Sequence, residues 1–262
     1  MENITVIIKT FERPRSLFRL LKSLRKHYPR IPIVIADDSR VSSEADVRKA
    51  FPDLRMEFHT MPFDSGASAG RNLCLRQVRT PYFLLCDDDF VFDRRADLEL
   101  AQDLLEQHDL DLLGGLYYDV FPLSAREALK DLLSFRFFRL RNQLSMQGVA
   151  RRFFGNLVTQ ADGSVKLEQI PYTDPLVRCD LVQNFFLART QRVRDTVGGW
   201  DDKLKIGGEH EAFFYKAKGA GLRVGNSERF GIVHYQETNK TYQGFRDRAR
   251  DIRPKEFRDW FK

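Results

Sequence analysis

An apolar segment that runs into three consecutive carboxylates constrains the fold of this chain more than any other feature. Residues 82–92 read YFLLCDDDFVF, so Asp87, Asp88 and Asp89 interrupt a run that is otherwise apolar. Adjacent buried carboxylates repel one another and would protonate unless a cation or hydrogen-bond donors accompany them. The residues before them predict a strand that ends at Cys86. The acids would then stand at a strand tip, where open α/β sheets bind ligands.

Oxygen ligands beside a phosphate-bearing partner suit Mg²⁺ or Mn²⁺, so the triplet is a candidate metal site. The alternative is an acidic loop that caps a following helix. The apolar residues on both sides of the triplet favour the metal site over this alternative.

Strands and helices alternate along the chain with short connections, which predicts a mainly parallel, doubly wound α/β sheet. The expected strands are 4–8, 31–36, 56–60, 82–86, 110–116, 177–190, one from 222 and 230–235. The expected helices begin near Pro14, span 43–50, run from the 63–72 segment to Val78 with Ser68 as its cap, span 94–107, and run from about 209 to 219. In this arrangement the acidic strand ends converge.

Three further segments are predicted, and the two basic ones among them have more than one interpretation. Residues 127–144 predict an amphipathic basic helix, which either packs on the core with a solvated basic face or contacts a membrane surface or an acceptor. Residues 153–170 predict a β-hairpin about an Asp162-Gly163 turn. Residues 236–262 predict a solvated terminal helix or a basic aromatic contact with an anionic membrane. We therefore divide the chain into a domain at 1–235 and a basic aromatic tail at 236–262.

Composition limits the class of protein. A chain of 262 residues with a net charge of +6 favours phosphate-rich ligands, anionic membranes or nucleic acid, but no nucleic-acid recognition motif is present, and we expect no such partner. Three scattered cysteines suggest neither a disulfide framework nor a thiolate zinc site. The first residues predict a buried strand rather than a signal peptide, and no stretch approaches the ~20 apolar residues of a membrane span. A cytoplasmic protein is expected.

The acidic strand ends and an arginine near a glycine turn together predict a site for a nucleotide diphosphate. Asp37 or Asp38 could accept hydrogen bonds from a ribose or base. Gly70 permits a close approach, and Arg71 could neutralise a phosphate. One or two carboxylates of the 87–89 triplet would hold a divalent cation that bridges the diphosphate. Neither a Walker loop nor a Rossmann glycine loop is present.

The ordered motifs IKTFERP, IADDS, SAGRN, LLCDDDF, NFFLART and GGEHEAFF resemble the GT-A nucleotide-sugar glycosyltransferases of the large inverting family 2, in particular the ganglioside-type β-1,4-N-acetylgalactosaminyltransferases. The resemblance covers about residues 4–234. It implies a GT-A fold, a UDP-sugar donor, Mn²⁺ or Mg²⁺, and a glycan or glycolipid acceptor.

The resemblance also implies roles for individual residues. The nucleotide pocket would be lined by Thr10, Glu12, Asp38 and Arg71. The ribose and phosphates would contact Asp87 and Asp88. The principal metal ligand would be Asp89, with Asp87 as a second candidate. His234 would be the late histidine recruited to the metal, although a satisfied core histidine is an equal alternative.

The expected catalytic base lies in the GGEHE segment. The family pattern is Gly-Glu-Asp with the aspartate as base, and this chain departs from it with His210 at that position. Histidine can serve as a base because its unperturbed pKa is about 6.5. Glu209 and Glu211 compete with it, although both acids also offset the helix dipole. Positions i and i+2 point to different faces of a helix, so both acids are not expected in one pocket. We favour Glu211 and His210 equally, with Glu209 as a supporting or acceptor-binding residue.

These features predict a metal-dependent inverting glycosyltransferase that moves a sugar, with N-acetylgalactosamine as the expected one, from a UDP-sugar to a glycan or glycolipid at the cytoplasmic face of a membrane. A sugar-phosphate nucleotidyltransferase is a rival, but IIKTFERP lacks the glycine-rich amino-terminal loop expected of that class. The histidine at position 210 raises a second rival, a pseudoenzyme that only binds nucleotide or glycan.

Overall fold

The computed structural model describes residues 1–262 except 122–124, 135–148, 237–241, 246 and 248–262. Strands and helices follow the chain as β1 Ile4–Thr10, α1 Pro14–His27, β2 Ile33–Asp37, α2 Glu44–Ala50, β3 Met56–Thr60, α3 Ala67–Gln77, β4 Tyr82–Asp87, β5 Phe90–Val91, α4 Leu98–Gln107, β6 Leu112–Val120, α5 Ala125–Leu133, β7 Val149–Arg151, β8 Gly155–Thr159, β9 Val165–Gln169, β10 Val177–Arg178, β11 Phe186–Arg189, α7 Thr190–Thr196, α8 Glu209–Gly219 and β12 Val224–Tyr235. No helix in these described ranges has the length and apolar character of a transmembrane segment.

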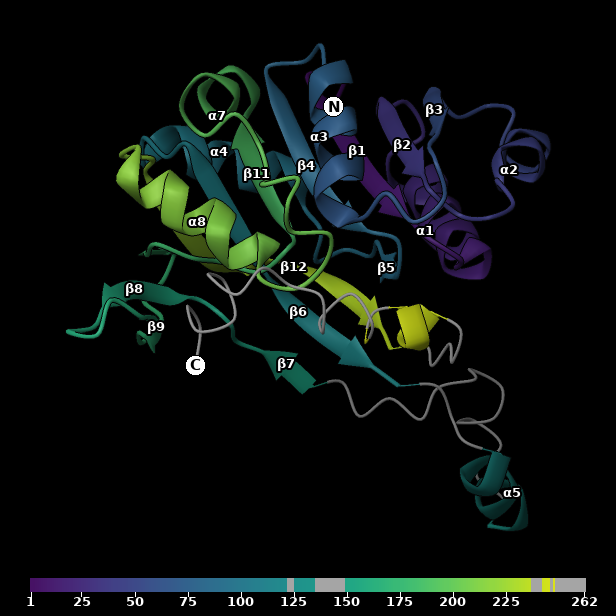
Figure 1. The fold of residues 1–262 in the computed structure, drawn as a ribbon. Helices are drawn as coiled ribbons and strands as arrows, with labels where there is room; N and C mark the ends of the chain where they lie inside the picture. The colour runs from purple at the N-terminus through teal and green to yellow at the C-terminus, as the bar shows by residue number, and fades with distance from the viewer. Residues whose placement is uncertain (122–124, 135–148, 237–241, 246, 248–262) are drawn as a thin grey trace.

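One large sheet organises the molecule, with strand order β10-β12-β6-β11-β4-β1-β2-β3 (Figure 1). The pairs β3–β2, β2–β1, β1–β4 and β6–β12 are parallel, whereas β11 runs antiparallel to both β4 and β6. The sheet is therefore mainly parallel, as the sequence predicts. The hairpin of β8 and β9 forms a separate two-stranded sheet with Asp162 and Gly163 at its turn, which confirms the predicted hairpin.

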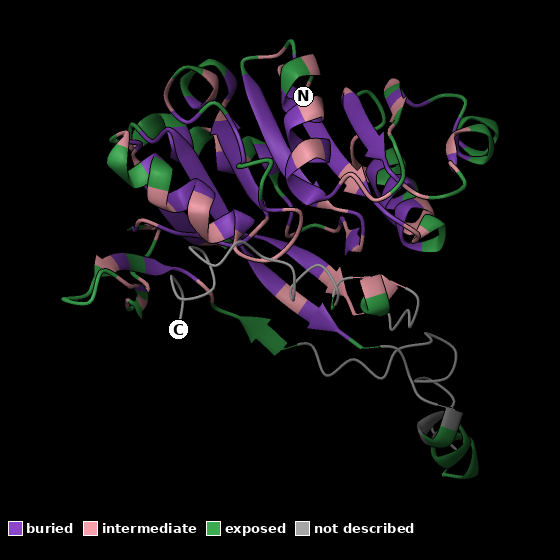
Figure 2. Ribbon diagram, viewed as in Figure 1, coloured by how far each residue is buried: buried purple, intermediate pink, exposed green. Residues whose placement is uncertain are grey.

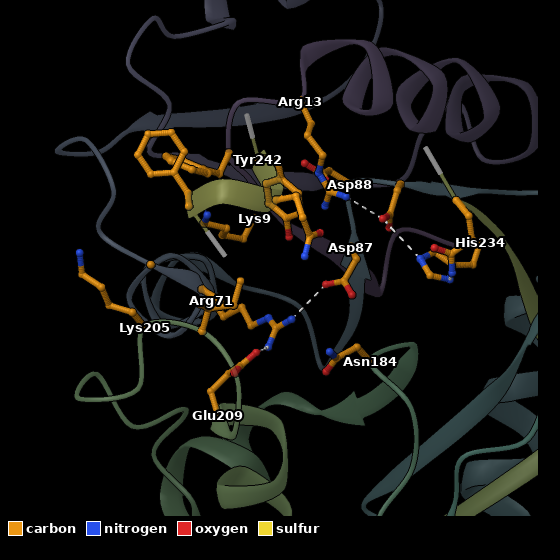
Figure 3. A pocket seen from close by; sticks show the side chains of 18 of the residues that line it. Lys9, Arg13, Arg71, Asp87, Asp88, Asn184, Lys205, Glu209, His234 and Tyr242 are labelled. Atoms are coloured by element: carbon orange, nitrogen blue, oxygen red, sulfur yellow. Dashed lines mark hydrogen bonds and ion pairs between the residues drawn. The ribbon is translucent and has the colours of Figure 1, made fainter. Parts of the chain in front are cut away.

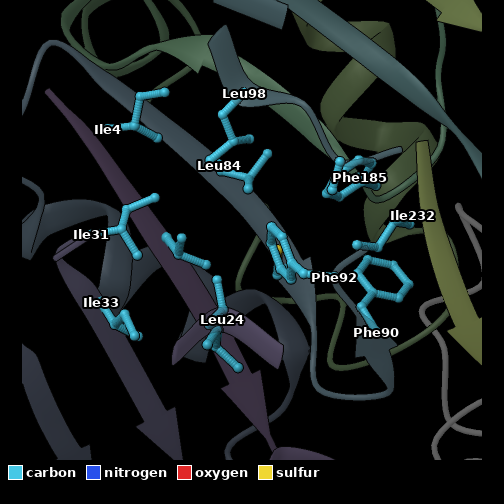
Figure 4. Close-up of a cluster of buried hydrophobic side chains, with 14 of the residues drawn as sticks. Ile4, Leu24, Ile31, Ile33, Leu84, Phe90, Phe92, Leu98, Phe185 and Ile232 are labelled. Carbon is cyan, nitrogen blue, oxygen red and sulfur yellow. The ribbon is translucent and has the colours of Figure 1, made fainter. Parts of the chain in front are cut away.

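Alternating apolar residues give the sheet two buried faces. Along β1, Ile4, Val6 and Ile8 belong to one apolar cluster and Ile7 to the other. The first cluster also holds the buried leucines of α1 and α4 (Figure 4), and the second holds Cys74 and Leu75 of α3 and the phenylalanines of α8. Figure 2 shows the central strands largely buried, with exposed residues on the outer surfaces of the helices. Helices thus cover both faces of the sheet, which confirms the doubly wound prediction.

Several predicted boundaries are wrong for identifiable reasons. The run 177–190 is not one strand: it forms β10 and β11, and the residues between them cross the sheet. The two strands expected from 222 and over 230–235 are one strand, β12, which passes a register shift between Ser227 and Gly231. Ser68 does not cap α3, because its Oγ donates to the Leu204 carbonyl at 2.6 Å and Gly66 stands at the cap position.

Two predicted segments lie partly outside the described residues. Of the amphipathic segment 127–144, the structure describes the helix α5, which ends at Leu133. Of the tail 236–262, it describes Gln236, a helical turn over 242–245 and Asp247. The division of the chain at residue 235 stays a prediction.

Candidate functional site

A cavity of about 820 Å³ opens at the carboxyl ends of the central parallel strands. Its size falls within the range of about 300–1,000 Å³ that is usual for small-molecule sites. The side chains that line it come from the ends of β1 and β4, the start of α3, β6, β7, β12, the turn before α8 and the tail turn (Figure 3). They are Lys9, Phe11, Arg13, Asp64, Gly66, Ala67, Arg71, Asp87, Asp88, Asp89, Tyr117, Phe121, Arg151, Asn184, Lys205, Ile206, Glu209, His234, Gln236, Tyr242, Gln243 and Phe245.

The three carboxylates after β4 have separate partners. Arg13, at the start of α1, donates from Nη1 to Asp89 Oδ2 at 2.8 Å and from Nη2 to Asp88 Oδ1. Asp88 is fully buried, and its Oδ2 also accepts a hydrogen bond from Thr10 Oγ1 at 2.7 Å. One guanidinium from β1–α1 therefore neutralises two of the three acids, which is the donor field that such a triplet requires.

The third acid, Asp87, belongs to a different ion-pair chain. Arg71 in α3 donates from Nη2 to Asp87 Oδ1 at 3.0 Å and from Nη1 to Glu209 Oε1 at 3.4 Å. Arg71 is itself only 5% exposed and lies 5.7 Å from the ring centroid of Trp200. This arginine thereby connects the tip of β4 to the first residue of α8.

The carboxylates differ in their affinity for protons. Burial raises the pKa of Asp88 to about 6 despite the opposing effect of Arg13. For Asp89, burial also acts to raise the pKa, but Arg13 and His234 outweigh it and hold the pKa below the ordinary value. Asp89 is therefore the more persistent anion of this pair, which suits a residue that faces a cation.

His234 stands at the far end of the triplet. Its Nε2 lies 3.4 Å from Asp89 Oδ2, and its Nδ1 lies 2.7 Å from Asp119 Oδ1. Burial acts to lower the pKa of His234, but Asp89 and Asp119 together raise it. The ring lines the pocket beside Asp89, and it also packs on Phe90 and Tyr117 with a partner for each nitrogen, so both alternatives for this histidine stay open.

The donor atoms fit a divalent cation at one point of the pocket. Asp89 Oδ1 is buried without a hydrogen-bond partner. The groups that could bind a metal at this point are the Asp89 carboxylate and the neighbouring His234 imidazole. Within the described residues, no group of three or more His, Cys, Asp or Glu side chains could by itself hold a metal ion. A cation here would need oxygen ligands from a bound phosphate and water as well.

Unpaired buried polar atoms mark where the pocket is prepared for a ligand. Four such atoms belong to side chains that line it: Arg13 Nε, Asp89 Oδ1, Asn184 Oδ1 and Glu209 Oε2. Buried polar atoms normally have partners, so a group of four around one cavity indicates a polar ligand.

Residues predicted to contact the nucleotide lie mostly one layer behind the pocket surface. The Asp38 carboxylate pairs with Lys9 Nζ at 2.7 Å and accepts from the Gly66 amide at 2.8 Å. Glu12 joins two loops, since its backbone amide donates to Ser39 Oγ and its Oε1 accepts from the Arg40 amide. A Cβ at Gly70 would lie 2.5 Å from Lys9 Cγ, so this glycine makes room for Lys9 rather than for a ligand.

Asp37 does not face the pocket. It is fully buried, and its carboxylate accepts hydrogen bonds from the Ser39 and Ser43 amides and from Ser43 Oγ. All of these partners belong to the β2–α2 loop. The proposed contact of Asp37 with a ribose or base is therefore corrected to a loop-ordering role.

Of the three candidate bases, only Glu209 lines the cavity. Glu209 is 6% exposed. Arg71 donates to its Oε1, and its Oε2 has no hydrogen-bond partner. His210 points into the core, where Nε2 donates to the Val182 carbonyl at 2.5 Å and the ring stands edge-on to Phe214. Glu211 is half-buried and does not line the cavity. The order of preference from the sequence, Glu211 and His210 before Glu209, is thus not supported by placement.

The buried state of His210 predicts a specific acid sensitivity. Burial, assisted by Arg71, lowers the pKa of His210 to about 3, so the folded protein keeps the ring neutral while the unfolded chain protonates it near 6.5. The unfolded state therefore binds more protons below pH 6.5, and the free energy of unfolding is expected to fall by about 1.4 kcal/mol for each pH unit from there towards pH 3. In His210→Gln, which keeps a donor for the Val182 carbonyl, this contribution should vanish. Urea denaturation between pH 4 and 7 compares the two proteins, and parallel pH curves would contradict the prediction.

Sequence reasoning missed several cations and amides of the site. Lys9 and Arg13 belong to the IKTFERP motif at residues 8–14. Three adjacent carboxylates need nearby cations, and this need was the signal that could have identified both residues. Asn72 follows Arg71 and exchanges hydrogen bonds with the Trp200 backbone, through Nδ2 to the carbonyl at 2.7 Å and through Oδ1 from the amide at 2.8 Å. The adjacent Arg71 and Asn72 together hold the turn that leads to Glu209, a long-range contact with no signature in the local pattern.

With this geometry established, comparison with known proteins places the chain in a family. The model of the family described as "Glycosyl transferase family 2" matches residues 5–162. The chain belongs to glycosyl transferase family 2. The recognition from sequence motifs is therefore confirmed.

This family 2 chain is also similar to individual proteins. It is 38% identical over 232 residues to β-1,4 N-acetylgalactosaminyltransferase 1 of Rattus norvegicus, a match that covers 88% of this chain and 38% of that protein. It is 45% identical over 112 residues to β-1,4 N-acetylgalactosaminyltransferase 2 of Mus musculus, covering 43% of this chain and 21% of that protein. The chain thus spans well under half the length of these curated relatives.

Solved structures support the fold. The S. aureus TarS 1–349 structure in complex with UDP-GlcNAc superposes with a TM-score of 0.63 at 18% identity, covering 91% of this chain and 60% of TarS 1–349. The same protein in complex with UDP gives a TM-score of 0.61 at 19% identity, covering 96% of this chain and 66% of that structure. The predicted GT-A fold is therefore confirmed.

Proposed function

We propose that this chain is a metal-dependent inverting glycosyltransferase that uses a UDP-sugar, with UDP-N-acetylgalactosamine as the donor, and a hydroxyl of a glycan or glycolipid as the acceptor. The observation that carries the proposal is the single cavity that holds Asp87–Asp89, Arg71, His234 and the unpaired Glu209 carboxylate. The donor is supported by the N-acetylgalactosaminyltransferases that match 88% of the chain and by the fold shared with a UDP-GlcNAc-binding protein.

The residues divide the cavity into a nucleotide-diphosphate end and a transfer end. Asp89 and His234, with Asp87 as a further candidate, would hold Mn²⁺ or Mg²⁺ against the diphosphate. Bound there, the cation would stabilise the negative charge that develops on departing UDP. Thr10 and Asp38 would act from behind the surface, because Thr10 holds the Asp88 carboxylate that pairs with Arg13, and Asp38 pairs with Lys9.

Glu209 would perform the proton transfer. Its Oε2 takes the proton of the acceptor hydroxyl while that oxygen bonds to the anomeric carbon of the donor sugar. The bond between the anomeric carbon and the UDP oxygen breaks, and UDP leaves with the electron pair from the opposite face. A single displacement of this kind inverts the configuration at the anomeric carbon.

The experiment that tests the function measures binding and turnover together. Isothermal titration with UDP should show binding that strengthens when Mn²⁺ is added, and UDP-N-acetylgalactosamine should be hydrolysed or transferred. Asp89→Asn should remove the Mn²⁺-dependent part of UDP binding, whereas Asp93→Asn, outside the cavity, should retain it. Equal Mn²⁺ dependence in Asp89→Asn would refute the metal assignment, and a wild-type chain that binds no UDP-sugar would refute the function.

We also propose that α5 contacts an anionic phospholipid surface at the cytoplasmic face. Three of its leucines are unusually exposed for apolar side chains: Leu129 at 56%, Leu132 at 49% and Leu133 at 73%. Exposed Arg126 and Lys130 lie on the same helix, which projects from the body of the protein (Figure 1). Apolar residues with flanking cations are typical of interfacial helices.

The membrane contact predicts a difference between two variants. Leu129→Asp/Leu133→Asp should lose most of its flotation with phosphatidylserine-containing vesicles. The matched exposed change Val41→Asp, in another part of the chain, should not affect it. If the wild-type chain fails to float with such vesicles, the proposal is wrong.

A further inference from the structure

A short segment between β10 and β11 places one amide side chain in the pocket. Residues 181–185 cross β6 at two adjacent glycines, Gly114 and Gly115. A Cβ at Gly114 would lie 2.4 Å from Val182 Cβ, and one at Gly115 would lie 2.9 Å from the Phe185 ring. Only glycines allow this close crossing, so the sequence of β6 fixes where the segment lies.

Both neighbours of Asn184 are held in place. Gln183 accepts a hydrogen bond from the Tyr117 amide at 2.9 Å and donates to the Arg151 carbonyl at 2.6 Å. On the other side, the Phe185 ring stacks on Phe230 with centroids 4.6 Å apart. The position of Asn184 is therefore imposed by its surroundings, as expected for a pre-organised binding residue.

The side-chain oxygen of Asn184 has no hydrogen-bond partner although it is buried and its residue lines the cavity. Figure 3 shows this side chain below Asp87 and on the same side of the pocket as Glu209. The nearby cation Arg71 directs its two terminal nitrogens to Asp87 and Glu209. A buried amide oxygen without a donor is destabilising, so this one is expected to accept its hydrogen bond from a ligand.

The chemistry of the ligands separates the candidates. Phosphate and carboxylate oxygens only accept hydrogen bonds at neutral pH, so a diphosphate does not satisfy an amide oxygen. A sugar ring carries hydroxyl groups, and an N-acetylated sugar adds an amide N–H, all of which are donors. The unpaired oxygen therefore needs a ligand hydroxyl or N–H rather than a phosphate, and its place beside Glu209 favours a transferred or acceptor sugar over the ribose and base of the nucleotide.

We propose that Asn184 is a specificity-determining residue whose Oδ1 accepts a hydrogen bond from a hydroxyl or acetamido N–H of a sugar bound beside Asp87 and Glu209. This inference rests on the proposed function and adds the recognition of the sugar. The sugar is either the one transferred or the terminal sugar of the acceptor, and the two sources give different results in the following experiment.

The experiment compares wild type, Asn184→Ala and Asn184→Asp with Asn156→Ala, an exposed asparagine of the β8–β9 hairpin that serves as a control. Titration with UDP, UDP-galactose and UDP-N-acetylgalactosamine in the presence of Mn²⁺ gives the donor affinities. Initial rates at varied acceptor concentration give KM and kcat. Thermal unfolding checks that each variant is folded, and Asn184→Asp keeps an acceptor oxygen in nearly the same shape.

In Asn184→Ala, UDP affinity should stay within twofold of wild type. Either the affinity for the UDP-sugar should fall by about tenfold, or the KM for the acceptor should rise by about tenfold. If the UDP-sugar binds more weakly in the absence of acceptor, the contact is with the transferred sugar. If only UDP-N-acetylgalactosamine loses affinity and UDP-galactose does not, the hydrogen-bond donor is the acetamido N–H. A raised acceptor KM with intact donor binding assigns it to the acceptor. Asn184→Asp should retain more sugar affinity than Asn184→Ala.

Two results would overturn the inference. Parallel losses of UDP and UDP-sugar affinity would assign Asn184 to the nucleotide or metal end, and unchanged sugar affinity and KM would show that it contacts no sugar. In both cases the wild-type chain still binds and transfers, so the proposed function stands. Absence of UDP-sugar binding by wild type is the separate result that removes the function and the inference together.

Discussion

Replacing Glu209 with glutamine is expected to lower kcat by about 10²- to 10⁴-fold, the range found when a positioned general base is removed. The glutamine has nearly the same shape but cannot take a proton from the acceptor hydroxyl. Its amide oxygen can still accept the hydrogen bond that Arg71 donates to Oε1, so the pocket should keep its form. UDP affinity, measured by titration with Mn²⁺, should therefore change by less than about threefold, which is below ~0.7 kcal/mol.

Neighbouring residues provide matched controls for Glu209. Glu211→Gln makes the same chemical change two positions along α8, where the side chain does not line the cavity, and His210→Gln alters the core-facing ring. Both should retain kcat within about fivefold, a change of ~1 kcal/mol in the barrier. A large loss in either of them with full activity in Glu209→Gln would return the role of base to the residues that the sequence favours. A wild-type chain that binds UDP but transfers nothing would support a binding-only protein.

The fold could be predicted from the sequence because local patterns and sheet topology agree. Strand β3 lies where the β-rich run predicts it, and α1 begins at the predicted Pro14 with its leucines buried. Predictions failed where tertiary contacts override local preference. The apolar run 177–190 contains β10 and β11 because its middle residues cross β6 at Gly114 and Gly115, which no periodicity in the run itself can indicate.

The site could be predicted only in part. The position of Asp87–Asp89 at the end of β4 follows from the apolar run before it, and the pairing of Arg71 with Asp87 shows that the predicted arginine lies beside these acids. The sequence could not predict which of the first residues of α8 faces the pocket. A helix places successive residues about 100° apart, so a shift of one residue decides whether Glu209 or His210 faces the ligand. That choice depends on Arg71, which is distant in sequence.

The second large effect concerns stability: Arg71→Met is expected to lower the free energy of unfolding by about 3–5 kcal/mol. Arg71 is the cation between Asp87 and Glu209, and its guanidinium is buried. Removing it leaves two carboxylates in the same low-dielectric pocket without a counter-charge, whereas methionine fills a similar volume. Urea denaturation at pH 7 measures the loss. The control Arg48→Met removes an exposed pair with Glu44 and should cost only about 0.3–0.5 kcal/mol.

Neutralising the two acids distinguishes a charge effect from a packing effect. If unpaired charge causes the loss, Asp87→Asn and Glu209→Gln should each restore part of the stability when combined with Arg71→Met, although each change alone in the presence of Arg71 is destabilising. Such non-additivity is expected for residues in one ion-pair network. Additive losses across the combined variants would instead mean that Arg71 acts through its packing on Trp200. The same network would then hold Glu209 by shape alone, and the unpaired Oε2 would owe its position to the Asn72 turn rather than to Arg71.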